Sequence, residues 1–64
     1  MITRFRDNNA KRNIRIVTQQ YKVGLYVAVY DDDSDTFLYQ YAIDIPEEEY
    51  HNKLREIFKD TLIN

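Results

Sequence analysis

Asp31, Asp33 and Asp35 stand at every second position, which is the spacing of oxygen ligands at the start of a calcium-binding loop. Such a loop also needs glycine at its sixth position and a bidentate glutamate at its twelfth. Counted from Asp31, these positions hold Thr36 and Ala42. The pattern therefore favours a solvated turn, and we expect neither a metal ion nor another cofactor.

His51 is the one histidine of the chain, Ser34 is its one serine, and cysteine is absent. Covalent catalysis needs a nucleophile beside a base, but Ser34 falls in a predicted turn and His51 beside the apolar stripe of a predicted helix. We therefore expect an ordinary surface histidine. Gly24 is the single glycine, which excludes a glycine-rich phosphate loop. We predict no enzymatic activity and no small-molecule substrate.

Charge is sorted along the chain. Residues 1–30 carry six basic side chains and one acidic, residues 31–64 carry three basic and ten acidic, and the net charge is −2. Such opposed fields concern partners rather than fold. One hypothesis is that the acidic half mimics a phosphate backbone and occupies the nucleic-acid groove of another protein. The acidic surface of this hypothesis comprises Asp31, Asp32, Asp33, Asp35, Glu47 and Glu48.

The basic half suggests an alternative, which is nucleic-acid binding. Basic side chains neutralise phosphates, and Tyr26 and Tyr30 could stack on bases. The acidic total, however, opposes long-range attraction to DNA. The basic residues of this alternative are Arg4, Arg6, Lys11, Arg12 and Arg15.

Sixty-four residues are enough for one domain, residues 1–64, whose small core leaves its stability marginal. Without cysteine no disulfide can add stability, whereas a partner or self-association can. The charged N-terminal segment lacks the apolar run of a signal peptide, and no segment has the ~20 apolar residues that cross a bilayer. We expect a cytoplasmic protein without a membrane partner.

Residues 13–43 have the alternation typical of an antiparallel sheet. Apolar residues alternate over 13–19 and 36–43, and residues 22–30 are apolar on both faces, which favours the central position. Residues 7–13 and the acidic segment supply turns. Residues 1–11 form either a basic arm or, over 2–6, a charged edge strand.

Two hairpins bring the apolar rows to one face. A short turn near Gln20–Tyr21 pairs Val27 with Ile14, and the acidic turn pairs Val29 with Phe37. Both hairpins then bury the same face, and this agreement supports the meander. The predicted buried rows of the second and third of these strands are Val23, Leu25, Val27 and Val29, and Phe37, Tyr39, Tyr41 and Ile43.

Residues 46–62 read as a helix. Asp44 and Glu47 have capping-box spacing, and Pro46 suits the first turn. At 1.5 Å per residue the helix is about 25 Å long and covers a strand of eight residues end to end. The apolar stripe consists of Tyr50, Leu54, Ile57, Phe58 and Leu62. The predicted fold class is α+β, a two-layer ββ(β)βα domain: a three- or four-stranded antiparallel meander with one C-terminal helix packed on one face.

The face that the helix leaves open carries the candidate interface. In the predicted register Arg15 lies opposite Tyr26, where guanidinium–ring stacking is possible. Arginine and tyrosine among apolar neighbours are typical of interface centres. We expect this face to bind a protein partner or a second copy in a homodimer. The residues of this interface are Arg15, Val17, Tyr26, Tyr30, Leu38 and Gln40.

The order of elements over residues 13–62 resembles the arm-binding domains of some tyrosine recombinases. That resemblance implies DNA recognition by a sheet face, but the strands 22–30 and 36–43 carry only Lys22 as a basic residue. A composition rich in Asn, Ile, Lys, Asp and Tyr is common in AT-rich bacterial and phage genomes. The leading hypothesis is therefore a small phage- or mobile-element-encoded regulator or inhibitor that docks on a protein. Nucleic-acid binding and a structural role in a larger assembly are the alternatives.

Overall fold

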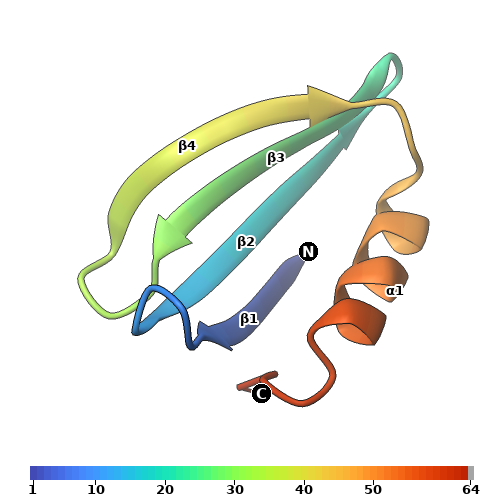
Figure 1. Ribbon diagram of the computed structural model, residues 1–64. Coiled ribbons are helices and arrows are strands. Elements are labelled where there is room, and N and C mark those ends of the chain that lie inside the picture. The colour runs from blue at the N-terminus through green and yellow to red at the C-terminus, as the bar shows by residue number, and fades with distance from the viewer. Residues whose placement is uncertain (64) are drawn as a thin grey trace.

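The computed structural model describes residues 1–63 and shows a four-stranded antiparallel sheet with one C-terminal helix on one of its faces (Figure 1). This arrangement confirms the predicted α+β class, with the N-terminal segment in the sheet as an edge strand. The strands lie in the order β1-β2-β3-β4. The elements are β1 (Ile2–Asp7), β2 (Arg12–Tyr21), β3 (Gly24–Asp31), β4 (Thr36–Ile43) and α1 (Glu47–Ile57).

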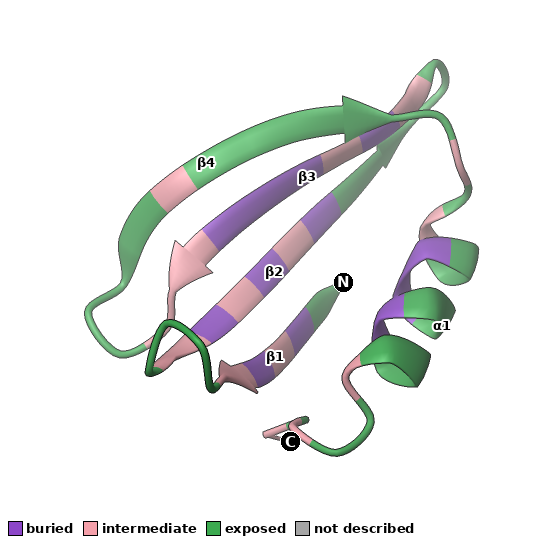
Figure 2. Ribbon diagram, viewed as in Figure 1, coloured by how far each residue is buried: buried purple, intermediate pink, exposed green. Residues whose placement is uncertain are grey.

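The core lies between the sheet and α1, as the alternation predicts. Leu25 and Val27 of β3 are 0% exposed, and Leu54 of α1, at 7%, belongs to the same apolar cluster. Burial alternates along β1 and β2 and is nearly continuous in the middle of β3 (Figure 2). The two inner strands of the sheet are therefore β2 and β3. The side of the sheet that faces the helix is the buried side.

The first predicted register is wrong by four residues. Tyr21 pairs with Gly24, so the turn consists of Lys22 and Val23, and Val23 is 92% exposed at its tip. Gly24 adopts φ +150°, a conformation that side chains disfavour. The predicted place of Val23 in the buried row is therefore wrong. Because the shift is an even number of residues, the side chains that remain in β2 and β3 keep their predicted faces.

The second register is wrong by two residues over most of β4. Val29 pairs with Tyr39, Tyr30 pairs with Phe37, and the extra residue is Leu38. This irregularity turns Leu38 toward the core, against which it packs, so its predicted place on the open face is wrong. Phe37 instead shares the open face with Tyr30, and their rings meet edge to face with centroids 5.7 Å apart.

The helix α1 is shorter than predicted and is capped differently. Pro46 is the N-cap residue, without a side-chain cap, so the predicted capping box of Asp44 is absent. The Gln20 side chain of β2 accepts the Glu47 N–H at 2.8 Å instead. The helix ends at Ile57, whose side chain is 70% exposed although it fits the predicted stripe.

The chain beyond α1 returns to the sheet. Residues 61–63 run beside β1, where Arg6 N–H donates to Thr61 O (2.8 Å) and Ile63 N–H donates to Arg4 O (3.0 Å). The Phe58 ring stacks on Phe5 with centroids 3.8 Å apart. The apolar residues that continue the helical spacing beyond Ile57 therefore belong to a non-helical segment, which covers the β1 edge of the sheet.

The helix covers only part of its face of the sheet. It packs against β1 and β2, and Figure 1 shows β4 at the far side from it. Tyr50 extends toward β4, where its hydroxyl meets that of Tyr41 at 2.5 Å. The exposed fractions of Tyr39 and Tyr41 are nonetheless 56% and 39%. The helix was expected to cover this face along its whole length, but α1 ends at Ile57 and packs against the β1–β2 half.

Candidate protein interface

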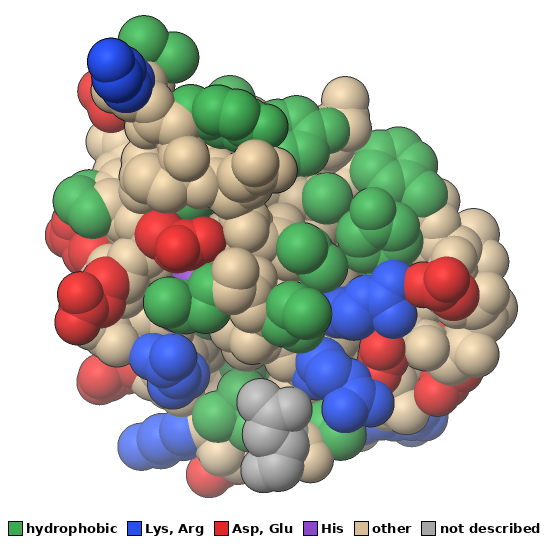
Figure 3. Space-filling model, turned by 180° about the vertical axis from the view of Figure 1, so that it is seen from behind, with side chains coloured by type: hydrophobic (Ala, Val, Ile, Leu, Met, Phe, Trp, Pro, Cys, Tyr) green, Lys and Arg blue, Asp and Glu red, His purple; other side chains and the backbone are tan. Residues whose placement is uncertain are grey.

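The open face brings together most of the predicted interface residues. Val17 of β2 lies opposite Ile2 of β1 on one side and Ala28 of β3 on the other, and Ala28 lies opposite Gln40 of β4. Seen from behind, hydrophobic side chains gather across the molecule and basic and acidic side chains border them (Figure 3). The hydroxyl of Tyr26 donates to the Gln40 side chain. The alternation of the strands is sufficient to predict this shared face.

Arg15 stacks on a tyrosine, but not on the predicted one. Its guanidinium carbon lies 4.7 Å from the centroid of the Tyr30 ring, because the observed register places Arg15 opposite Tyr30 rather than Tyr26. A guanidinium at this distance is attracted by the negative face of the ring. Phe37 flanks the same ring. The centre of the candidate interface is therefore the Arg15–Tyr30 stack, with the Phe37 ring edge-on beside it.

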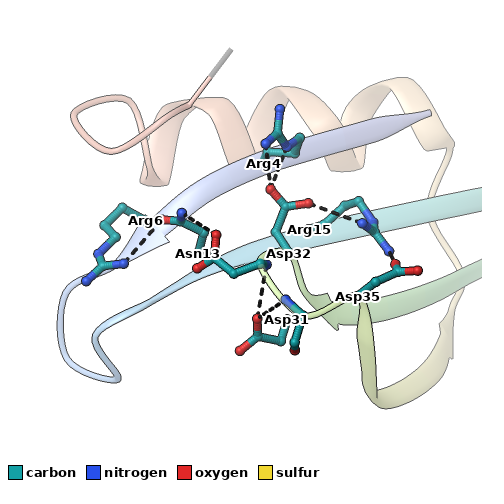
Figure 4. Close-up of polar contacts among 9 residues, drawn as sticks. Arg4, Arg6, Asn13, Arg15, Asp31, Asp32 and Asp35 are labelled. Atoms are coloured by element: carbon teal, nitrogen blue, oxygen red, sulfur yellow. Dashed lines mark hydrogen bonds and ion pairs between the residues drawn. The ribbon is translucent and has the colours of Figure 1, made fainter.

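Asp32 joins two arginines beside the stack (Figure 4). Its carboxylate accepts from Arg4 Nε at 2.7 Å and from Arg15 Nη1 at 3.2 Å, while Arg15 Nη2 bonds Asp35. The Asp32 side chain is 8% exposed. The four side chains thus form an ion-pair cluster whose charges sum to zero, which we call the Arg–Asp cluster (Arg4, Arg15, Asp32, Asp35).

The cluster shifts the pKa values of Asp32 and Arg15. The hydrogen bond from Arg4 and, after it, the bond from Arg15 hold the pKa of Asp32 below its ordinary value. The hydrogen bond to Asp35 raises the pKa of Arg15. Folding therefore favours the ionised forms of Asp32 and Arg15, and Arg15 is held over Tyr30 by two carboxylates.

The predicted acidic surface is not one surface. Asp31 accepts the N–H groups of Asp33 and Ser34, both at 3.1 Å, and the Ser34 N–H lowers the pKa of Asp31. Asp33 accepts from Asn13 at 3.0 Å. Glu47 and the exposed Glu48 begin α1, at the opposite end of β4 from this turn. The contribution of this region to the structure is turn formation and ion pairing.

The predicted basic residues are likewise divided. Arg4 and Arg15 belong to the Arg–Asp cluster, and Arg6 donates to Asn13 Oδ1 at 3.4 Å. Lys11 lies exposed in the β1–β2 turn at φ +58°. Arg12 lies on the other face, where it lines a groove of about 250 Å³ between β4 and α1. No single face collects the five basic side chains.

His51 is not on the surface, so that expectation is wrong. It is 0% exposed, and its ring lies between Thr3 Oγ1 (2.5 Å from Nδ1) and Thr18 Oγ1 (2.7 Å from Nε2). Burial lowers the pKa of His51. Thr3 and Thr18 stand at core-facing positions of their strands, and that pattern of polar residues in buried rows is the signal that could have revealed a polar helix residue between them.

Within residues 1–63, no group of three or more His, Cys, Asp or Glu side chains could hold a metal ion. The same range contains no helix long and apolar enough to cross a membrane.

Comparison with protein-family models, curated proteins and solved structures gives no match.

Proposed function

We propose that this protein is a non-catalytic protein-binding domain that docks another protein on the open face of its sheet. The observation that carries this proposal is the Arg15–Tyr30 stack, held in place by Asp32 and Asp35. Arginine and tyrosine are enriched among the residues that dominate binding energy. A side chain that is already ordered loses less entropy when a partner binds.

The surroundings of the stack support the same proposal. Ile2 and Phe37 are 54% and 49% exposed on this face. Figure 3 shows basic and acidic side chains beside the hydrophobic ones, which gives an apolar area with a charged rim. A partner surface with an apolar centre and polar residues around it would fit this face. Docking of this kind suits a regulator or inhibitor of the bound protein.

The geometry favours this proposal over catalysis and over the two charge-based hypotheses. Both ring nitrogens of the buried His51 are engaged by threonine hydroxyls, so the imidazole does not reach a bound substrate. The Arg–Asp cluster pairs two basic with two acidic side chains, and this neutralisation weakens both phosphate mimicry and phosphate binding. A structural role in a larger assembly would use the same face and differ only in the lifetime of the complex.

Affinity capture from cells that naturally produce the protein tests the proposal. Wild type should retain a specific protein that Tyr30→Ala loses and that Ile57→Ala keeps, because Ile57 is an exposed apolar residue on the helix layer. The captured protein is then purified and titrated against wild type and both variants, with circular dichroism as the check of folding. Equal affinities of wild type and Tyr30→Ala would overturn the open face as the docking surface.

A further inference from the structure

Strand β4 is an open edge of the sheet with little protection. Its eight residues include no charged side chain and no proline, and all except Leu38 are exposed. Edge strands of natural proteins usually carry charges, proline or a covering segment, because their free N–H and C=O groups pair readily with another strand. The irregularity at Leu38 lies near one end, so residues 39–43 keep a regular register with β3.

The opposite edge of the sheet is covered. The segment 61–63 bonds to β1 through the Arg6 N–H and the Arg4 C=O, and a bridge joins Leu62 to Phe5. Within residues 1–63 the sheet therefore offers one long free edge. Pairing through one edge by a two-fold axis closes at two copies, whereas two free edges would allow growth into fibres.

We propose that a second copy of this chain adds its β4 to this β4, antiparallel and about a two-fold axis at Gln40, to form one continuous eight-stranded sheet. This inference does not rest on the docking function proposed above, because it uses β4 and not the Arg15–Tyr30 stack. Both open faces would stay accessible and lie on one side of the joined sheet.

The sequence of β4 is self-complementary about Gln40. A two-fold axis there sets Tyr39 opposite Tyr41 of the second copy, on the helix-facing side, and sets the two Gln40 side chains opposite each other on the open side. Tyr39 and Tyr41 are already parallel within one chain, with centroids 6.3 Å apart and planes 20° apart. The dimer would extend this pair into a ladder of four rings, which would cover the tyrosines that α1 leaves exposed.

Charge favours a second copy as the occupant of this edge. The nearest charged residues, Asp35 and Asp44, would face Ile45 and Thr36 of the second copy, so no like charges meet across the axis. The Gln40 carbonyl oxygen already accepts from Tyr26, and its amide N–H groups can donate to the other Gln40. A pairing without charge repulsion and with matching rings is available to the chain itself.

Sedimentation velocity with charge-swapped variants tests the dimer. Wild type should shift from monomer to dimer as its concentration rises toward the millimolar range. Gln40→Lys and Gln40→Glu should each stay monomeric because like charges would meet at the axis, and an equimolar mixture of the two should dimerise again. Glu48→Lys on the exposed surface of α1 is the control for a change of net charge, and Tyr30→Ala should also leave the dimer intact.

Each other result overturns the inference. A wild type that stays monomeric, or one that grows beyond two copies, contradicts closure through β4. If both Gln40 variants still dimerise, the dimer does not form through the β4 edge. If the mixture of the two stays monomeric, the two-fold axis does not lie at Gln40. Circular dichroism of each variant shows that a monomer is a folded monomer.

Discussion

The Thr18 hydroxyl lies 2.7 Å from Nε2 of His51 and donates its own proton to Glu47 Oε2, also at 2.7 Å. Because that proton is committed, Nε2 carries the hydrogen that Thr18 accepts. Burial favours the neutral ring, whose Nδ1 then accepts from Thr3. This chain of hydrogen bonds suits a neutral imidazole. It ends at the N-terminal amine, 3.4 Å from Glu47 Oε2, and so ties the start of the chain to the start of α1.

The neutral His51 should make the protein less stable in mild acid. Burial, and after it the N-terminal ammonium, lowers the pKa of His51, although Glu47 opposes them. Below about pH 6.5 the histidine binds a proton in the unfolded chain but not in the folded chain. The free energy of unfolding is therefore highest above that pH and decreases below it by up to about 1.4 kcal/mol per pH unit. Glu47 also has a lowered pKa, and its contribution is lost only at lower pH.

Urea unfolding of wild type and His51→Gln between about pH 7.5 and about pH 5 measures this dependence. The variant should be less stable at neutral pH, since glutamine fits the two threonines poorly, but its stability should change less with pH. Parallel pH profiles of the two proteins would show that His51 does not titrate with unfolding.

Removal of the Asp32 charge should destabilise the fold more than removal of the Asp35 charge. Asp32→Asn leaves Arg4 and Arg15 without their shared carboxylate, at a cost of about 1 kcal/mol because solvent reaches the Arg4 side chain and screens the pair. Asp35 is 77% exposed, so Asp35→Asn should change stability little. Urea unfolding at neutral pH compares them.

Acid should remove the difference between wild type and Asp32→Asn. The pKa of Asp32 is lowered by folding, so its contribution is present above the ordinary carboxyl value of 3.8 and is lost as the pH falls below it. Equal stability of the two proteins already at neutral pH would mean that the Arg–Asp cluster adds nothing to folding.

Substitution by alanine should reduce stability very differently at two apolar residues of α1 that lie one turn apart. Leu54→Ala should cost about 2–4 kcal/mol, because it opens a cavity in the core, and this is a large share of the stability of so small a domain. Ile57→Ala should cost less than about 0.5 kcal/mol, because Ile57 is exposed. Thermal unfolding measures both, and similar losses would contradict the helix orientation.

Apart from Phe37 and Leu38 at the irregularity of β4, the faces of the strand residues were predictable from the sequence, and the registers were not. Alternation has a period of two residues, so it fixes which side chains share a face whatever the turn length. Val23 is apolar and β-branched like its strand neighbours, which hides its position in a turn. The position of that turn sets which residue lies opposite Arg15. The alternation therefore could not predict the Arg15–Tyr30 stack or the Arg–Asp cluster.

The extent of the helix was not predictable from its apolar period either. Phe58 and Leu62 continue the spacing of Tyr50 and Leu54, but they contact Phe5 from a segment that has left the helix. Pairing of this segment with β1 determines where the helix ends, since a short helix gains most of its stability from packing. The same competition decides whether the sheet has one free edge or two.

Deletion of residues 61–64 should therefore change the assembly of the protein. The truncated chain loses the backbone hydrogen bonds that Thr61 and Ile63 make with β1, while Phe58 and its stack on Phe5 remain. With β1 and β4 both free, pairing no longer closes at two copies, and we expect larger assemblies in sedimentation and thioflavin binding. The matched control combines the deletion with Gln40→Lys, which blocks the β4 pairing and should stop the growth. A truncated chain with the same mass distribution as wild type would show that residues 61–63 do not guard the β1 edge.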